Sequence, residues 1–291
     1  MLIRILAILF PIFAIVALGL IYGRFRKPDM GFANQLNMEV FVPALVFATL
    51  AGKSFEVTRY AGLAMGAAAV ILGSGLIAWP VAKLMKEAPK TFVPPMMFNN
   101  SGNIGLPLAL LAFGPQAMPA AVMMFLVENL LHFSFGAWLL DHHARLSNLW
   151  RIPVLMASVA GLTVSLTGIT LWAPLIKGLS LLGDISIPLL LFSLGVRLNS
   201  TPLGAWRVAV VGAMVCPLSG MLIAWPVARL LGLSGDQAGM LLVFGALPPA
   251  VLNYVFAERY HQEPDRVASI TLIGNVASLG FLPLALGIVL P

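Results

Sequence analysis

The chain consists almost entirely of apolar stretches about 20 residues long, separated by short loops that carry most of its charges. A helix needs about 20 predominantly apolar residues to span a bilayer. Ten such stretches fit the sequence, at 4–23, 33–52, 60–82, 91–112, 117–140, 153–172, 176–197, 207–229, 237–257 and 267–289. Because 60% of the residues are hydrophobic and only 10% are charged, against roughly 25% charged in a soluble domain, no soluble core accommodates them. The sequence therefore predicts an all-α integral membrane protein of ten transmembrane helices.

Several other classes of protein are disfavoured by the same sequence. The first stretch lacks a small-residue cleavage site, so we interpret it as a span and not as a removed signal peptide. Cys216 is the single cysteine, which excludes an intramolecular disulfide and disfavours a cysteine metal site. Asp141, His142 and His143 are adjacent, do not share a helix face, and are interpreted as a solvated loop. The charged residues behind the net charge of +6 lie singly in short loops, so we expect no binding of nucleic acid. We also expect no metal and no cofactor.

Successive loops lie on alternate sides of the membrane, and the basic residues are distributed unequally between these two sides. If both chain ends lie on one side, the opposite side holds twelve of the 17 Lys and Arg residues. The twelve are Arg24, Arg26, Lys27, Lys83, Lys86, Lys90, Arg145, Arg151, Arg197, Arg207, Arg259 and Arg266, and the other five are Arg4, Lys53, Arg59, Lys177 and Arg229. Because cytoplasmic loops carry an excess of Lys and Arg, the bias predicts a cell (inner or plasma) membrane protein with both termini extracytoplasmic.

The two halves of the chain resemble each other. Residues 76–84 read LIAWPVAKL and residues 222–230 read LIAWPVARL, so eight of nine residues are identical at an offset of 146. Further pairs at nearly the same offset are Pro43 with Pro188, Phe47 with Phe192, Phe98 with Phe244, and Asn129 with Asn275. Each half has five spans, and because five is an odd number the second half begins on the opposite side of the membrane from the first. We therefore predict two inverted five-helix repeats, 1–145 and 146–291, an architecture of many transporters.

The fourth and ninth stretches are interrupted at corresponding depths. The interrupting residues are Asn99, Asn100, Ser101, Gly102, Asn103, Gly105 and Pro107 in the fourth stretch, and Pro248, Pro249 and Asn253 in the ninth. Proline removes a helix hydrogen bond and clashes with the preceding turn, while glycine lowers helix stability. Opened backbone cannot face lipid, because unsatisfied peptide groups in hydrocarbon are costly. We expect both helices to break there and to face protein, water or a ligand.

A helix break of this kind suits an anion. Half-helices beginning near Ile104 and Ala250 would direct their positive N-terminal ends at the centre of the protein. Uncharged amides would bind a carboxylate without the cost of burying a lysine or arginine. The candidate substrate-binding residues are Asn99, Asn100, Ser101, Asn103, Pro248, Pro249, Asn253, Asn129 and Asn275. The alternative is that the asparagines only rescue a kinked helix, and Asn129 and Asn275 could equally be packing contacts between helices.

Ionisable residues at membrane depth are functional candidates by default. Glu39, Glu128 and Asp184 qualify, together with His132. Glu39 and Asp184 lie 145 residues apart, and each precedes the proline of its repeat by four residues. A carboxyl in such a position could carry a proton in a coupled cycle, or it could stay charged near a helix end that faces water. Glu39, Asp184 and Glu128 are the proton-coupling candidates.

The interrupted stretches also carry a resemblance to a known family. Residues 100–108, NSGNIGLPL, and residues 246–260, ALPPAVLNYVFAERY, followed by Pro264 and Asp265, resemble the fourth and ninth helices of the auxin efflux carrier family. Bacterial members of that family are described as malonate and malate permeases. The resemblance covers essentially the whole chain in length and span number, and Asn34, nine residues before Pro43, also fits.

The resemblance implies the fold of the bile acid sodium symporters. In that fold the fourth and ninth helices cross at the membrane midplane, and one domain moves against a scaffold. It also implies that Asn100 contacts the substrate carboxylate and that the protein forms a homodimer. Asn99 and Asn253 stand where plant members have prolines. The crossing is therefore more polar than theirs, which favours a small carboxylate over an aromatic, auxin-like substrate.

Four functions remain as hypotheses. The first is a carrier of small organic anions, mono- or dicarboxylates such as malonate or malate, working by uniport or with protons. The alternative within the same fold is a sodium-coupled symporter, although the amide cluster itself contains no acidic residue. An intramembrane enzyme is disfavoured because its acids would be scattered over three spans. A sensor would bind the ligand without moving it, and flux measurements separate it from a carrier.

Overall fold

The computed structural model describes residues 1–52, 56–143, 146–199 and 204–290. Within these ranges every regular element is a helix, and Asn99 and Pro249 form an isolated antiparallel β-bridge. Two of the basic residues used to predict the orientation, Lys53 and Arg145, lie outside the described residues.

Six helical segments of the described chain are long and apolar enough to cross a membrane. They are α1 (Leu2–Arg26), α4 (Val57–Met85), the run from η3 (Pro115–Ala117) through α7 (Met118–Leu131) and η4 (His132–Gly136) to α8 (Ala137–Leu140), α10 (Ala173–Arg197), α11 (Trp206–Leu230) and α14 (Pro264–Val289). Each coincides with one of the predicted spans. An all-α membrane protein is therefore confirmed, whereas ten spans in two inverted repeats stay a prediction.

The other four predicted spans are short or interrupted. The second consists of α2 (Gly31–Leu36), η1 (Asn37–Phe41) and α3 (Val42–Leu50), and the fourth of α5 (Pro89–Met97), η2 (Ser101–Gly105) and α6 (Leu106–Phe113). The sixth is α9 (Pro153–Thr167), preceded by the 3-10 turn η5 (Leu146–Arg151), and the ninth is α12 (Gly235–Gly245) followed by α13 (Leu252–Arg259). The breaks fall where the fourth and ninth stretches carry amides and prolines.

Two of these interruptions are π-helical turns next to a proline. The turn η1 leads into α3, whose second residue is Pro43, and η2 leads into α6, whose second residue is Pro107. Proline has no N–H and clashes with the carbonyl of the preceding turn. A π turn shifts the register of the backbone bonds there, so the chain stays helical up to the proline.

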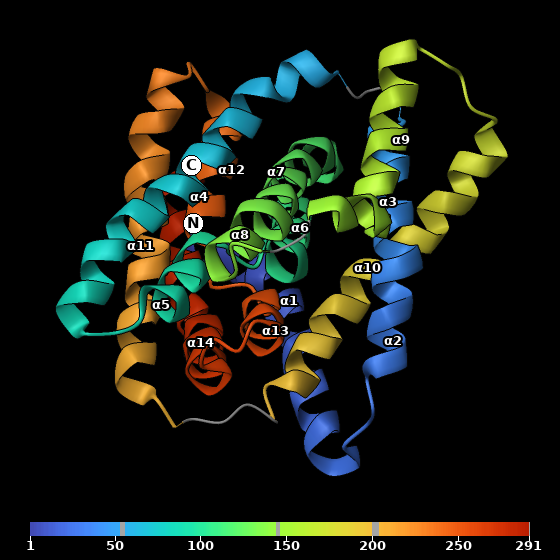
Figure 1. Ribbon diagram of the computed structural model, residues 1–291. Helices are drawn as coiled ribbons and strands as arrows, with labels where there is room; N and C mark the ends of the chain where they lie inside the picture. Colours follow the sequence, from blue (N-terminus) through green and yellow to red (C-terminus); the bar gives the residue numbers. More distant parts are fainter. Residues whose placement is uncertain (53–55, 144–145, 200–203, 291) are drawn as a thin grey trace.

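The helices pack as two groups. The first, here called the panel, contains α1, α2, η1, α3, α9 and α10, in which α1 packs on α10 and α3 packs on both α9 and α10. The second, here called the bundle, contains α4 to α7, η2 and α11 to α14, centred on contacts of α11 with α4, α12 and α14. Figure 1 shows α3, α9 and α10 on one side and α4, α11 and α14 on the other, with α6, α7 and α13 between them.

Glycines allow the closest helix contacts within each group. In the panel, a Cβ placed on Gly195 of α10 would lie 2.0 Å from the carbonyl oxygen of Val16 in α1. In the bundle, a Cβ on Gly220 of α11 would lie 2.1 Å from the carbonyl oxygen of Gly245 at the end of α12. Small residues are enriched at helix contacts in membranes because they let backbones approach. Both groups are therefore held by direct backbone packing.

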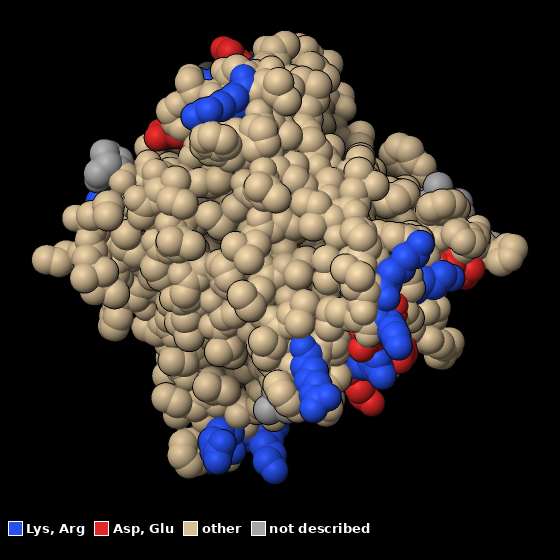
Figure 2. Space-filling model, turned by 90° about the vertical axis from the view of Figure 1, so that its left-hand side faces the viewer, with Lys and Arg blue, Asp and Glu red and all other residues tan. Residues whose placement is uncertain are grey.

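The outer face of the bundle is apolar over a broad band. Leu76 on α4 and Leu218 and Leu222 on α11 are exposed there. Figure 2 shows this face with its middle free of Lys, Arg, Asp and Glu, which gather at the edges. An exposed apolar surface of this extent suits contact with lipid.

Candidate functional site

The two interrupted helices meet at their breaks. The backbone N–H of Asn100 donates to the carbonyl of Pro248 at 2.7 Å, and the N–H of Ala250 donates to the carbonyl of Phe98 at 2.9 Å. Pro248 and Pro249 have no N–H, so α12 cannot continue through them as a regular helix. Each segment therefore supplies hydrogen-bond partners for backbone groups that the break leaves unpaired on the other. Backbone groups away from water need such partners.

Two asparagine side chains complete this exchange between the segments. Asn99 Nδ2 donates to the carbonyl of Phe244 at 2.7 Å, near the end of α12. Asn253 Nδ2 donates to the carbonyl of Phe98 at 2.8 Å, just beyond the end of α5. These amides therefore do rescue interrupted helices. Their Oδ1 atoms are buried and have no hydrogen-bond partner among the described residues.

Asn100 and Asn275 form a second amide pair at the same place. Asn100 Oδ1 caps η2 by accepting from the N–H of Asn103 at 3.3 Å, and its Nδ2 donates to Asn275 Oδ1 at 3.0 Å. Asn275, on α14, donates in turn to the carbonyls of Pro249 at 3.1 Å and Thr271 at 2.7 Å. One amide of α14 is thus bonded to both interrupted segments.

A buried carboxyl adjoins the break on the side of α7. Glu128 Oε2 accepts from Ser101 Oγ at 3.2 Å, and Glu128 Oε1 lies 3.1 Å from His132 Nδ1. All three side chains are buried. The amide cluster, which has no acidic residue in its own segment, therefore contacts one from the neighbouring helix.

A cavity of about 230 Å³ lies between the panel and the bundle. Its walls come from α2, η1, α3 and α10 of the panel and from η2, α7 and the region around α13 of the bundle. Six amide side chains line it, those of Asn34, Asn37, Asn99, Asn100, Asn103 and Asn129. Glu128 and Arg197 are the charged residues of its described lining. The cavity therefore combines amides and charges of both signs with a lining that is otherwise mostly apolar.

Asn37 is the lining residue with the most unused hydrogen-bonding capacity. It is 1% exposed, and neither its Nδ2 nor its Oδ1 has a partner among the described residues. Buried polar groups are normally hydrogen-bonded, so an orphaned amide at a cavity wall indicates a bound water or ligand. On the same wall Ser193 of α10 donates to Asn34 Oδ1, which holds α2 against α10.

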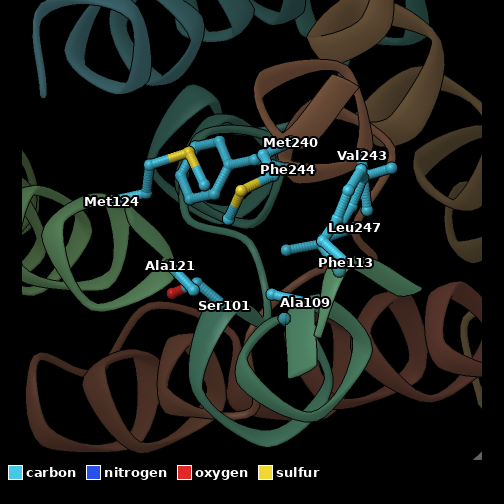
Figure 3. A pocket seen from close by; sticks show the side chains of 10 residues that line it. Ser101, Ala109, Phe113, Ala121, Met124, Met240, Val243, Phe244 and Leu247 are labelled. Carbon is cyan, nitrogen blue, oxygen red and sulfur yellow. The ribbon is translucent and has the colours of Figure 1, made fainter. Parts of the chain in front are cut away.

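A second, smaller cavity of about 20 Å³ lies beyond Ser101. Figure 3 shows Met124, Met240 and Phe244 facing Ser101 and Ala121 across it. The volume is sufficient for about one water molecule. Ser101 lines this small cavity and Glu128 lines the large one. The hydrogen bond from Ser101 to Glu128 therefore connects the walls of the two cavities.

The structure distributes the predicted residues over four locations. Asn99, Asn100, Asn103, Asn129 and Glu128 line the large cavity. Ser101 lines the small one, while Pro248, Pro249, Asn253 and Asn275 lie in the crossing behind the cavity wall. Glu39 and Asp184 are exposed on the panel and do not line either cavity, and Glu39 accepts from Gln35 at 3.0 Å.

Sequence reasoning did not place Asn37, Ser193 or Arg197 in the candidate site. Asn34 and Asn37 are three residues apart, which puts both amides on one helix face, and this spacing was an available signal. Arg197 was counted only as a topology signal, although it ends the apolar stretch of α10. Its charged neighbours include Glu258.

Interrupted helices that adjoin a cavity inside an all-helical membrane protein are typical of membrane transporters. Residues 142–286 match the family described as "Membrane transport protein". The chain is 21% identical to an uncharacterized transporter of Methanocaldococcus jannaschii over 89% of each chain. It is 27% identical to auxin efflux carrier component 6 of Arabidopsis thaliana over 58% of its length, and 30% identical to component 1 over 44%.

The family model and these relatives support a transporter of the auxin efflux carrier family, which is a family of membrane transporters and not of enzymes. The resemblance seen in the interrupted stretches is thereby confirmed. The matches span only 28% and 22% of the two plant carriers' own lengths.

Proposed function

We propose that this chain carries small organic anions, mono- or dicarboxylates such as malonate or malate, across the cell membrane by alternating access. The orphaned amide of Asn37 in the cavity between panel and bundle is the observation that carries the proposal. Its Nδ2 offers donors and belongs to a wall of six amides. The match to a family described as "Membrane transport protein" supports transport itself.

The donors in the cavity favour a carboxylate. Arg197 lines the cavity, and a guanidinium can bind a carboxylate through its planar fork of N–H groups. The helix that begins with η2 directs its N-terminus, capped by Asn100, at the same space. Pockets for drug-sized ligands measure roughly 300–1,000 Å³, and this cavity of about 230 Å³ is smaller. A small acid therefore suits it better than a large aromatic one.

Two features support ten spans in two inverted repeats, 1–145 and 146–291. The backbone bonds at the crossing are reciprocal, since Asn100 bonds to Pro248 and Ala250 bonds back to Phe98. A two-fold relation between the segments produces such a pair. Each helix group also combines elements of both halves, because the panel takes α1 to α3 from the first and α9 and α10 from the second.

The position of the cavity supports an elevator-like cycle. A ligand bound between two helix groups is carried from one side of the membrane to the other when the bundle moves relative to the panel. The crossing and the amide pair of Asn100 and Asn275 lie wholly within the bundle, so the ligand contacts they provide would move as a unit. The orientation follows from the basic residues, with both termini extracytoplasmic, and the functional unit is a homodimer.

Uptake of radiolabelled carboxylates into proteoliposomes tests the proposal. We expect saturable uptake of at least one small mono- or dicarboxylate, absent from protein-free liposomes and inhibited by unlabelled acid. A panel of acids that shows no saturable uptake, with protein that is folded by size exclusion, contradicts it.

Sodium coupling is the second candidate, favoured by the contact between Glu128 and Ser101 that brings a carboxylate to the opened backbone. Carboxylate and carbonyl oxygens are the ligands that hard cations prefer. Replacing sodium with choline in the same uptake assay decides between the two. We expect unchanged initial rates, whereas a strong loss of uptake in choline supports the sodium symporter.

A further inference from the structure

An ionisable pair is buried at the junction of α7 and η4. Glu128 is 4% exposed and His132 is 1% exposed, and Glu128 Oε1 lies 3.1 Å from His132 Nδ1. Ionisable groups inside a membrane are costly and usually functional. The hydrogen bonds of Asn253 and Asn99 connect the two interrupted segments, whereas Glu128 bonds to Ser101 and to His132.

Two aromatic rings lie against the imidazole of His132. Its ring stacks on Phe98 with centroids 4.1 Å apart and planes at 6°, and it lies 4.6 Å from the ring of Phe256. Aromatic faces attract cations. Its Nε2 is buried and has no hydrogen-bond partner among the described residues.

The pair reaches the candidate anion site directly. Glu128 lines the large cavity, where Arg197 of α10 is the other charged residue of the described lining. The panel segments α2, η1 and α3 contribute uncharged side chains there, as do η2 and the described residues around α13. Glu258 is a further charge near Arg197. Each proton bound by the pair therefore makes the cavity more positive by one charge.

We infer that Glu128 and His132 form a proton-binding site that takes up one proton when the organic anion binds and releases it when the anion leaves. The inference rests on the proposed anion transport. The proton comes from the solution and is held by the pair as a coupled unit. Only an N–H or O–H bond forms, and it breaks again when the anion leaves. An ionised Glu128 opposes a second carboxylate in the same cavity, and the added proton removes that opposition.

Of the three predicted proton-coupling carboxyls, Glu128 alone has this position. Glu39 and Asp184 are exposed on the panel and line neither cavity. Ser101 extends the pair towards the small cavity, since its hydroxyl donates to Glu128 and lines a space for about one water molecule. The hydrogen-bonded chain from His132 through Glu128 to Ser101 therefore connects the anion cavity with the apolar space beyond it.

Titration of malonate binding by calorimetry between pH 6.5 and pH 8.5 tests the inference. For uptake of one proton per anion, the affinity of the wild-type protein falls by up to tenfold per pH unit on the alkaline side of the pair's titration. Glu128→Gln keeps the size of the side chain and removes the carboxylate, and we expect its affinity to vary much less with pH. The matched control is Asp236→Asn, an exposed carboxyl in the first turn of α12, which should behave as the wild type.

Equal pH dependence in the wild type and Glu128→Gln overturns the inference, and so does a flat profile in the wild type. The ligand's own titration is common to all variants and cancels in the comparison. A second readout needs no anion, namely the ¹⁵N chemical shifts of His132 in labelled protein, assigned by their loss in His132→Gln. Shifts that stay constant from pH 5 to pH 9 overturn the proton site. Shifts that titrate while no carboxylate binds instead overturn the anion transport proposed above.

Discussion

At the scale of single residues, the asparagines of this chain have two different roles. Asn99 and Asn253 donate to backbone carbonyls across the crossing and so satisfy interrupted helices. Asn37 has no partner for either side-chain polar atom and lines the cavity. The amide rescue considered from the sequence therefore accounts for the first two, and ligand binding remains open for the third.

Replacing Asn37 with Ala should weaken transport more than stability. A hydrogen bond to a charged group contributes about 1.5–3 kcal/mol, so we expect KM for the transported acid to rise roughly tenfold to a hundredfold. The thermal midpoint should stay the same or rise, because the substitution removes a buried polar group that has no protein partner. Concentration-dependent uptake and thermal unfolding of the same preparation measure both quantities.

The matched control for Asn37→Ala is Ser186→Ala on α10. The Ser186 hydroxyl is also buried and without a partner in the described structure, but it does not line the large cavity. Its removal should leave KM unchanged. A KM for Asn37→Ala equal to that of the wild type would exclude Asn37 from the ligand site.

The sequence predicted part of this site and missed part of it. Amides next to glycine and proline within an apolar stretch indicated Asn99, Asn100 and Asn103, because the chemistry that breaks a helix is local. Asn37 and Arg197 belong to other helices, and only the packing of η1 and α10 against the crossing brings them to the same cavity. Such contacts between distant segments leave no local pattern in one sequence.

At the scale of elements, the apolar stretches predicted where the helices lie, but only some of the interruptions within them. Pro248 and Pro249 marked the break between α12 and α13, since proline cannot continue a helix. The π-helical turn η1 was not predicted, although Pro43 lies two residues after its end. A proline can be accommodated by a π turn or by a complete break, and the sequence does not distinguish these outcomes.

Replacing Gly220 with Ala should destabilise the protein. A Cβ there would lie 2.1 Å from the carbonyl oxygen of Gly245, so α11 and α12 would have to separate. Overpacking of this kind costs about 1–3 kcal/mol. We expect a lower thermal midpoint in detergent, measured by tryptophan fluorescence.

Gly280→Ala on α14 is the control for Gly220→Ala. A Cβ on Gly280 would meet no atom within 4 Å. Alanine in a helix interior is more favourable than glycine by about 1 kcal/mol, so its midpoint should stay the same or rise. Equal midpoints for the two variants would show that the contact between α11 and α12 tolerates a methyl group.

At the scale of the whole molecule, the division by sequence and the division in space differ. The 146-residue offset predicts halves at 1–145 and 146–291, whereas the panel and the bundle each combine helices of both halves. Which helices associate depends on their contacts and not on their order. The predicted halves therefore rest on the sequence offset, and the division into panel and bundle was not predicted.

Joining the two groups should stop transport. Ile5 of α1 contacts Gly287 of α14, with 3.8 Å between the Ile5 Cδ1 and the position of a Cβ on Gly287. We expect a short thiol-reactive cross-linker to abolish uptake in Ile5→Cys/Gly287→Cys on a Cys216→Ala background, because the bundle can then no longer move along the panel. Reduction of a cleavable linker should restore uptake.

The control pair for this cross-link lies within the panel. A Cβ on Gly161 of α9 would be 2.9 Å from the Cβ of Leu50 in α3. Cross-linked Gly161→Cys/Leu50→Cys should therefore retain uptake. Full activity of the α1–α14 cross-link, with complete modification confirmed by mass spectrometry, would contradict movement between the groups.

The central claim is that a small carboxylate binds between the panel and the bundle, against the amides of η1 and η2. The most direct measurement is an experimental structure of the protein with bromomalonate, in which anomalous scattering locates the bromine atom. We predict a bromine peak in the cavity of about 230 Å³, with carboxylate density within hydrogen-bond distance of Asn37 or Asn100. Bromine bound elsewhere, or an empty cavity at saturating ligand in protein that transports malonate, would contradict it.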